Sequence, residues 1–150
     1  MGPVGLFLAA EMSKEVDLSP GCRIMDLACG TGTTSALFAK HFDTQVSAVD
    51  LWVKPDVLAR KFEKLGVADK VCPFNVDVTE SMPFPQGHFD AIFCMGGTHY
   101  FEGTVDFAEW IAALLRPSGV LCVGSPCFNR EFTAEELGDL PLVYDDGSDM

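Results

Sequence analysis

Hydrophobic residues along the chain gather into short runs that polar turns separate. Five of these runs have the length and composition of β-strands: residues 22–28, 46–49, 71–78, 89–95 and 120–124. The runs are continuous rather than alternating, which is typical of parallel strands that are buried on both faces.

Apolar residues at helical spacing lie between these strands. A short stripe from Leu6 to Met12 precedes the first strand, and residues 34–42 follow it after a glycine turn. Further helices are predicted around Leu58, Phe62 and Leu65 and around 108–115, and residues 116–119 are predicted to form a turn. The alternation predicts an α/β fold with a Rossmann-like, doubly wound, mostly parallel sheet. In such a sheet the ligand site lies at the carboxyl ends of the strands.

The first strand ends in a turn that contains Gly30 and Gly32. Glycines let the backbone turn sharply and approach a ligand closely. No G-K-[ST] follows, which excludes a Walker A loop, and Ser35 stands where a dinucleotide fingerprint needs its third glycine. The turn alone therefore leaves open another nucleotide loop or a turn without a ligand.

Two acidic residues indicate which kind of ligand the glycine turn could bind. Asp50 follows Gly30 by 20 residues at the end of the second strand, where a carboxylate can accept hydrogen bonds from both hydroxyls of a ribose. Asp26 precedes the glycines, where it would repel a pyrophosphate and attract an ammonium. S-adenosylmethionine has an adenosine, an amino-acid end and no phosphate, so it fits both carboxylates. The alternative is that Asp26 only caps its own loop.

Residues 24–32 resemble motif I of the class I S-adenosylmethionine-dependent methyltransferases, with Ala28 in place of the first glycine. Four further segments are similar to the family and follow its order along the chain: residues 48–51, Asp77 together with 82–84, residues 89–92 and residues 115–119. The resemblance therefore covers nearly all residues from 19 to 125. Met1-Gly2-Pro3 and residues 50–52 are similar to the methyltransferase type 11 subgroup.

The resemblance implies a role for each matching residue. It places these residues at the cofactor: Asp26, Ala28, Cys29, Gly30, Gly32, Asp50, Leu51, Trp52, Asp77, Val78 and Met95. Asp26 and the turn would hold the methionyl end, Asp50 the ribose, and Leu51, Trp52, Asp77 and Val78 the adenine. If the acceptor loses a proton, His99 is the candidate general base and Tyr100 a weaker one. The alternatives are that His99 is a packing residue and that Asp77 is a turn cap.

Charge and cysteines indicate the partners and the compartment. The formal net charge of -12 repels nucleic acids and anionic membranes, so we expect a small-molecule substrate. The six cysteines include no C-x-x-C pair, which predicts reduced thiols in the cytoplasm and no metal site. Residues 1–10 are apolar but lack a basic segment, so we expect neither a signal peptide nor a membrane helix.

We divide the chain into a methyltransferase core over 1–127 and an acidic, flexible tail over 128–150 that carries seven acidic residues and one basic residue. The family's sheet normally gains two strands after the fifth, and nothing in 128–150 resembles either. We therefore expect a truncated core whose strand 120–123 is an exposed edge that pairs with another copy or aggregates.

The function predicted is methyl transfer from S-adenosylmethionine to a small acceptor that the sequence does not identify. Two alternatives stay open: a protein that binds the cofactor without catalysis, and an NAD-dependent oxidoreductase of the same fold. The oxidoreductase fits less well because its turn should carry a third glycine or alanine and no Asp26.

Overall fold

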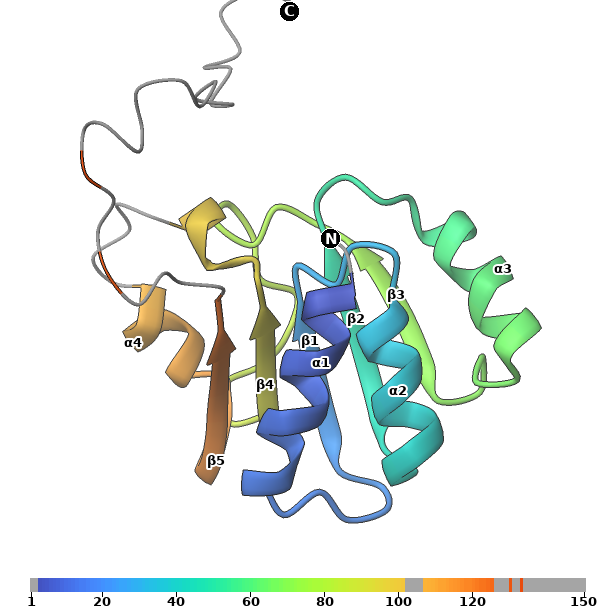
Figure 1. Ribbon diagram of the computed structural model, residues 1–150, viewed down its shortest axis with the longest axis horizontal. Helices are drawn as coiled ribbons and strands as arrows, with labels where there is room; N and C mark the ends of the chain where they lie inside the picture. The colour runs from blue at the N-terminus through green and yellow to red at the C-terminus, as the bar shows by residue number, and fades with distance from the viewer. Residues whose placement is uncertain (1–2, 102–106, 126–129, 131–132, 134–150) are drawn as a thin grey trace, which may run out of the picture.

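A computed structural model of the chain describes residues 3–101, 107–125, 130 and 133. Its centre is a parallel sheet with the strand order β3-β2-β1-β4-β5 (Figure 1). The strands are β1 (Arg23–Leu27), β2 (Gln45–Asp50), β3 (Val71–Asn75), β4 (Phe89–Met95) and β5 (Leu115–Gly124). The predicted parallel α/β sheet is therefore confirmed, and the strand order reverses between β1 and β4.

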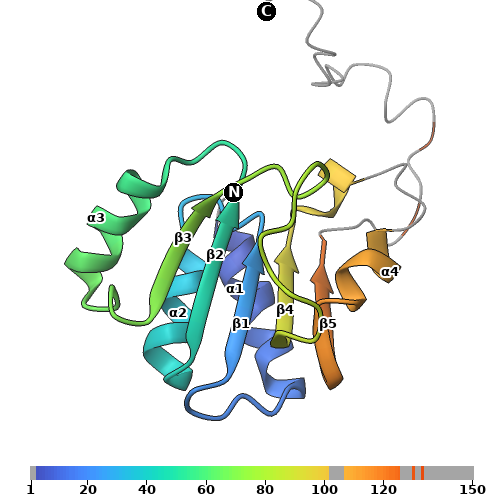
Figure 2. The same ribbon diagram turned by 180° about the vertical axis from the view of Figure 1, so that it is seen from behind.

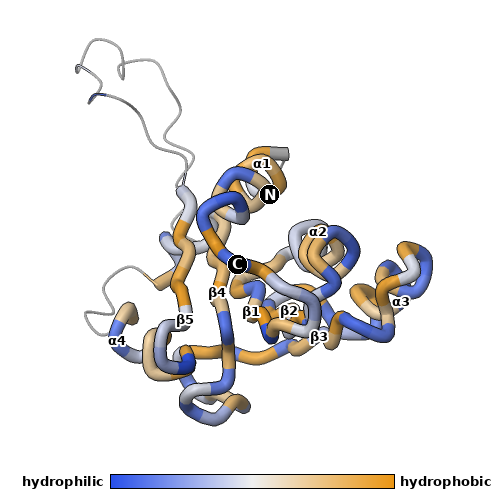
Figure 3. The backbone as a smooth tube through the Cα atoms, turned by 90° about the horizontal axis from the view of Figure 1, so that it is seen from below, coloured by the Kyte–Doolittle hydropathy of each residue, from blue (hydrophilic) through white to orange (hydrophobic). Residues whose placement is uncertain are grey.

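Helices cover both faces of this sheet. They are α1 (Pro3–Met12), α2 (Thr33–Phe42), α3 (Pro55–Leu65) and α4 (Phe107–Ala112), with the 3-10 turns η1 (Ser13–Glu15) and η2 (Thr98–Phe101). Helices α1 and α2 lie on one face, and α3 lies beside β3 (Figures 1 and 3). The chain between β3 and β4, together with α4, covers the other face (Figure 2). Two apolar layers result, one on each side of the strands.

The ends of three elements differ from the prediction. Strand β3 ends at Asn75 rather than at residue 78, because the chain turns away where Asp77 accepts a hydrogen bond from Thr79 N. Helix α4 ends at Ala112. Strand β5 already begins at Leu115, and its register with β4 jumps from Phe89↔Leu115 to Ala91↔Val120. The predicted turn over 116–119 is thus a bulge inside β5, because the chain on both sides of it pairs with β4.

Asp90, the second residue of β4, has a structural role. The Asp90 carboxylate accepts a hydrogen bond from Arg23 N at 2.6 Å and forms an ion pair with Arg116. It thereby ties the first residues of β1 and β5 to β4. These contacts lie at the amino ends of the strands, away from the edge where a ligand is expected.

The expected core over 1–127 and the tail over 128–150 stay predictions, because most of the tail lies outside the described residues. No helix among the described residues is long and apolar enough to span a membrane. Cys22, Cys29, Cys72, Cys94 and Cys122 are free thiols, whereas Cys127 is not described.

Candidate functional site

A cavity of about 180 Å³ opens at the carboxyl ends of the strands, beside the point where the strand order reverses. It is lined by Leu27, Ala28, Val49, Asp50, Leu51, Trp52, Val76, Asp77, Val78, Thr79, Tyr100 and Phe101. Six predicted cofactor residues are in this lining: Ala28, Asp50, Leu51, Trp52, Asp77 and Val78. The structure thus brings together residues that lie up to 50 positions apart in the predicted site.

Asp50 is the most firmly held side chain of the cavity. Its Oδ2 accepts a hydrogen bond from Gly30 N at 2.8 Å, and its Oδ1 accepts from Trp52 N and Val53 N at 2.9 and 3.0 Å. Asp26 pairs with Ala48 in the register of β1 and β2, so Asp26 and Asp50 project from the same face of the sheet. Through its three hydrogen bonds, the carboxylate of Asp50 joins the glycine turn to the loop after β2 and fixes both.

Two side chains that the sequence analysis did not consider support this arrangement. Asn75 donates from Nδ2 to the carbonyl oxygens of Asp50 and Leu51, at 3.1 and 2.5 Å. Lys61 reaches from α3 and donates from Nζ to the carbonyl oxygen of Thr31 at 2.7 Å. A polar residue at the end of β3 was a signal for Asn75, whereas nothing in the spacing of Lys61 on α3 distinguishes it from the other charged residues of that helix.

Asp26 lies beneath the turn rather than in the lining of the cavity. It is 1% exposed, and its Oδ2 accepts hydrogen bonds at 2.6 Å from the hydroxyls of both Thr34 and Ser35 on α2. Burial raises the pKa of Asp26 to about 6, and the charge of Asp50 adds to this, while the two hydroxyls oppose it. Ser35, which stands where a dinucleotide fingerprint has its third glycine, thus helps to hold the Asp26 carboxylate.

The raised pKa of Asp26 predicts a pH dependence of stability. Between the usual value of 3.8 and about 6 the folded chain binds the Asp26 proton more tightly than the unfolded chain does, so this group stabilises the fold as the pH falls through 6. Relative to Asp26→Asn, the wild type should gain about 1–1.5 kcal/mol in free energy of unfolding from pH 7.5 to 5. Urea unfolding at both pH values measures this gain.

The comparison with Asp26→Asn is needed because the chain carries 22 acidic residues, whose mutual repulsion also weakens as the pH falls. That general effect is present in both proteins and cancels in the difference. Parallel pH profiles of the two proteins would contradict a raised pKa at Asp26.

The turn itself contains an unusual alanine. Ala28 has a φ of 56°, a left-handed conformation that costs an L-residue about 1–2 kcal/mol relative to glycine. Its methyl group lies against the backbone of Gly97, because a β-carbon built at Gly97 would be only 2.5 Å from Ala28 Cβ. The alanine that departs from motif I is therefore accommodated by a glycine in the loop after β4.

We predict that residues 28 and 97 are energetically coupled. Gly97→Ala alone should lower the free energy of unfolding by about 1–3 kcal/mol, because the two methyl groups would overlap. In an Ala28→Gly background the same substitution should lose most of that effect. Urea unfolding of the four proteins measures the coupling, and additive changes would show that the two residues do not meet.

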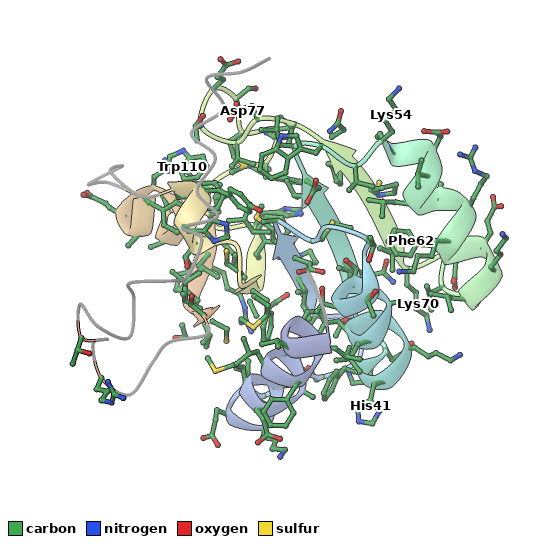
Figure 4. All side chains as sticks on the ribbon, turned by 45° about the horizontal axis from the view of Figure 1, so that its top comes forward. His41, Lys54, Phe62, Lys70, Asp77 and Trp110 are labelled. Carbon is green, nitrogen blue, oxygen red and sulfur yellow. The ribbon has the colours of Figure 1, made fainter. Side chains whose placement is uncertain are left out.

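The other predicted residues lie around the cavity in different ways. Asp77 is on the loop at this edge of the sheet (Figure 4), and its Oδ1 accepts hydrogen bonds from the amide and the hydroxyl of Thr79. The hydroxyl contact lowers the pKa of Asp77. Asp77 therefore caps its own turn while it also lines the cavity. Val78 is buried in the wall.

Five predicted residues other than Asp26 are outside the lining: Cys29, Gly30, Gly32, Met95 and His99. Met95 and Cys29 are buried, and burial raises the pKa of the Cys29 thiol, so it stays protonated. His99 is exposed, with its ring centroid 3.9 Å from that of Tyr100. A role for His99 as general base stays a prediction.

A larger and more open hollow of about 570 Å³ lies near the amino ends of β1, β2 and β3, with Arg23, Gln45 and Lys70 in its lining. Glycine turns and strand-end carboxylates are not part of it. We place the functional site at the smaller cavity, because parallel α/β sheets bind their ligands at the carboxyl ends of the strands.

Together, a parallel sheet with a reversal of strand order, a glycine turn and an acidic residue at the end of β2 are typical of α/β proteins that bind nucleoside-containing ligands. A model of a methyltransferase domain family matches residues 24–119, which is more than half of the chain. The chain belongs to this methyltransferase family. The predicted α/β fold and the predicted membership of a methyltransferase family are thereby confirmed.

Known proteins agree with this assignment. The 2-methyl-6-phytyl-1,4-hydroquinone methyltransferase of Synechocystis is 28% identical over 71% of this chain and 32% of its own length. A solved methyltransferase from Geobacter sulfurreducens in complex with S-adenosylhomocysteine shares the fold, with a TM-score of 0.68, 24% identity, and coverage of 87% of this chain and 50% of that one.

The solved structure of the cyclase SpnF is also similar, with a TM-score of 0.71 and 25% identity over 78% of this chain and 43% of that one. This chain therefore spans half or less of the length of each of these three proteins.

Proposed function

We propose that the chain binds S-adenosylmethionine in the cavity at the carboxyl edge and takes part in methyl transfer to a small-molecule acceptor. The observation that carries this proposal is the composition of the lining. It contains the carboxylates of Asp50 and Asp77 and, among the described residues, no Lys or Arg. Such a site favours a cationic ligand and disfavours a pyrophosphate.

The residues around the cavity fit the parts of the cofactor. Asp50 Oδ2 accepts a hydrogen bond from Gly30 N, and a carboxylate oxygen has acceptor capacity for a ribose hydroxyl as well. Leu27, Val49 and Val78 give an apolar floor of the kind that suits an adenine ring. When bound, S-adenosylmethionine supplies a methyl group on a positively charged sulfur. The chain then has to hold this group in line with the acceptor and exclude water.

A calorimetric titration tests the binding step. We expect S-adenosylhomocysteine and S-adenosylmethionine to bind and NAD to show no heat of binding. Binding of NAD with a comparable Kd, without binding of S-adenosylhomocysteine, would support the oxidoreductase and overturn the proposal.

Transfer itself is tested with S-adenosylmethionine labelled in its methyl group and a panel of small acceptors. Turnover of any acceptor supports the proposal. Tight cofactor binding without turnover would favour the second candidate, a protein that binds the cofactor without methylating. The similarity to the cyclase SpnF is the reason to retain this second candidate, because one fold can carry different chemistries.

We also propose that the chain forms homodimers through β5. Within the described residues β5 pairs only with β4, and its Val120 and Val123 are 39% and 43% exposed. An exposed apolar edge strand favours pairing with another chain. Light scattering after size exclusion measures the mass, and a monomer at high concentration would contradict the proposal.

A further inference from the structure

Two aromatic side chains meet over the cavity from opposite sides. Trp52 belongs to the loop after β2, and Tyr100 belongs to η2 after β4. Their ring centroids are 4.7 Å apart and the ring planes form an angle of 68°, an edge-to-face contact. Because β2 and β4 flank β1 in the sheet, the pair bridges the carboxyl end of β1.

Both rings are more exposed than Leu51, which is 44% exposed, and far more exposed than the buried floor. Trp52 is 62% exposed and Tyr100 is 51% exposed, although each contacts the other. The floor behind them is fixed, because Asp50 is 5% exposed and bonded to three backbone amides. Of these parts of the wall, the aromatic pair is the one that can move with the least loss of contacts.

The cavity under the pair is smaller than pockets that enclose ligands of the size of S-adenosylmethionine. Pockets that enclose ligands of comparable size measure about 300–1,000 Å³, whereas this cavity measures about 180 Å³. Enclosure of S-adenosylmethionine would therefore require part of the wall to move. Separation of Trp52 from Tyr100 would open the cavity without disturbing the hydrogen bonds of Asp50.

We propose that Trp52 and Tyr100 form an aromatic gate, which parts to admit the cofactor and meets again when the cavity is empty. This inference rests on the proposed function, because it assumes that S-adenosylmethionine binds in this cavity. Tyr100 is then a positioning residue that controls the rates of cofactor entry and release, independently of any acid-base role.

The gate is tested by following Trp52 fluorescence during mixing with S-adenosylhomocysteine. The chain has two tryptophans, so Trp110→Phe leaves Trp52 as the sole reporter. In this background Tyr100→Ala should speed both association and dissociation by about three- to tenfold, the strength of one aromatic pair. Tyr100→Phe keeps the ring and should retain the parent rates. Phe7→Ala, at an aromatic residue on α1 that is 65% exposed, is the matched control and should change neither rate.

The outcomes separate the gate from the function. If the parent binds and Tyr100→Ala leaves both rates within twofold, the gate is wrong and the cofactor site stands. Loss of binding in Tyr100→Ala would show that Tyr100 contacts the ligand and would contradict the gate. Faster rates in Tyr100→Phe would show that the Tyr100 hydroxyl, and not the contact between the two rings, slows entry and release. If the parent itself does not bind, the proposed function fails and the gate fails with it.

Discussion

Replacement of Asp50 by alanine should weaken the binding of S-adenosylhomocysteine by about 1.5–3 kcal/mol, or about 10- to 150-fold in Kd. The substitution removes the carboxylate that we assign to the ribose. It also leaves the amides of Gly30, Trp52 and Val53 without their acceptor, so the glycine turn and the loop after β2 lose their common anchor. Calorimetry measures the affinity, and circular dichroism establishes that the variant is folded at the temperature used.

Asp56→Ala is the matched control for charge. Asp56 lies on α3, is 62% exposed and pairs only with Arg60 among the ion pairs that the structure gives it, so its loss should leave the affinity unchanged. Asp50→Asn should fall between the two, because an amide offers one acceptor oxygen where the carboxylate offers two. An affinity of Asp50→Ala within twofold of the wild type would remove Asp50 from the site.

The sequence predicted the sheet well because its signals are local. Each strand contains a short apolar run, and these runs alternate with segments of helical spacing, which is typical of a buried parallel sheet. The position of Asp50 followed from the same logic, since the carboxyl ends of parallel strands share one edge. The family resemblance agreed with this order, and the fold and the class of protein followed from it.

What the sequence did not predict depends on polar contacts and on contacts between distant segments. Strand β3 ends at Asn75 because the chain turns where Asp77 accepts a hydrogen bond from Thr79 N, and the bulge in β5 depends on pairing with β4. The hydrogen bonds that the Asp26 carboxylate accepts from Thr34 and Ser35 were not predicted either. Apolar spacing carries no information on such polar partners.

The same limit applies to the loops around the cavity. Trp52 and Tyr100 are separated by 48 residues, and neither belongs to an amphipathic pattern, so their contact is visible only in the fold. The pairing of Ala28 with Gly97 is similar. In each case a residue of one loop sets the space available to another, which explains why the roles of single residues were predicted less completely than the sheet.

The second glycine of the turn is required for packing, and Gly32→Ala should lower the free energy of unfolding by about 2–4 kcal/mol. Gly32 has a φ of 69°, which disfavours any L side chain. A β-carbon there would lie 2.6 Å from Cζ and 2.8 Å from Cε1 of Phe62. Phe62 is fully buried on the inner side of α3 (Figure 4), so its ring cannot move away into solvent. Urea unfolding followed by circular dichroism measures the loss.

Gly30→Ala separates the two causes of this loss. Gly30 has a φ of 53°, but nothing lies within 4 Å of a β-carbon built there, so only the backbone strain of about 1–2 kcal/mol applies. A second variant, Gly32→Ala with Phe62→Leu, should lose less stability than the two single changes added together, because a smaller side chain makes room for the methyl group. Equal losses in Gly30→Ala and Gly32→Ala would assign the whole effect to the backbone. The contact between the turn and α3 would then contribute nothing to the choice of glycine at position 32.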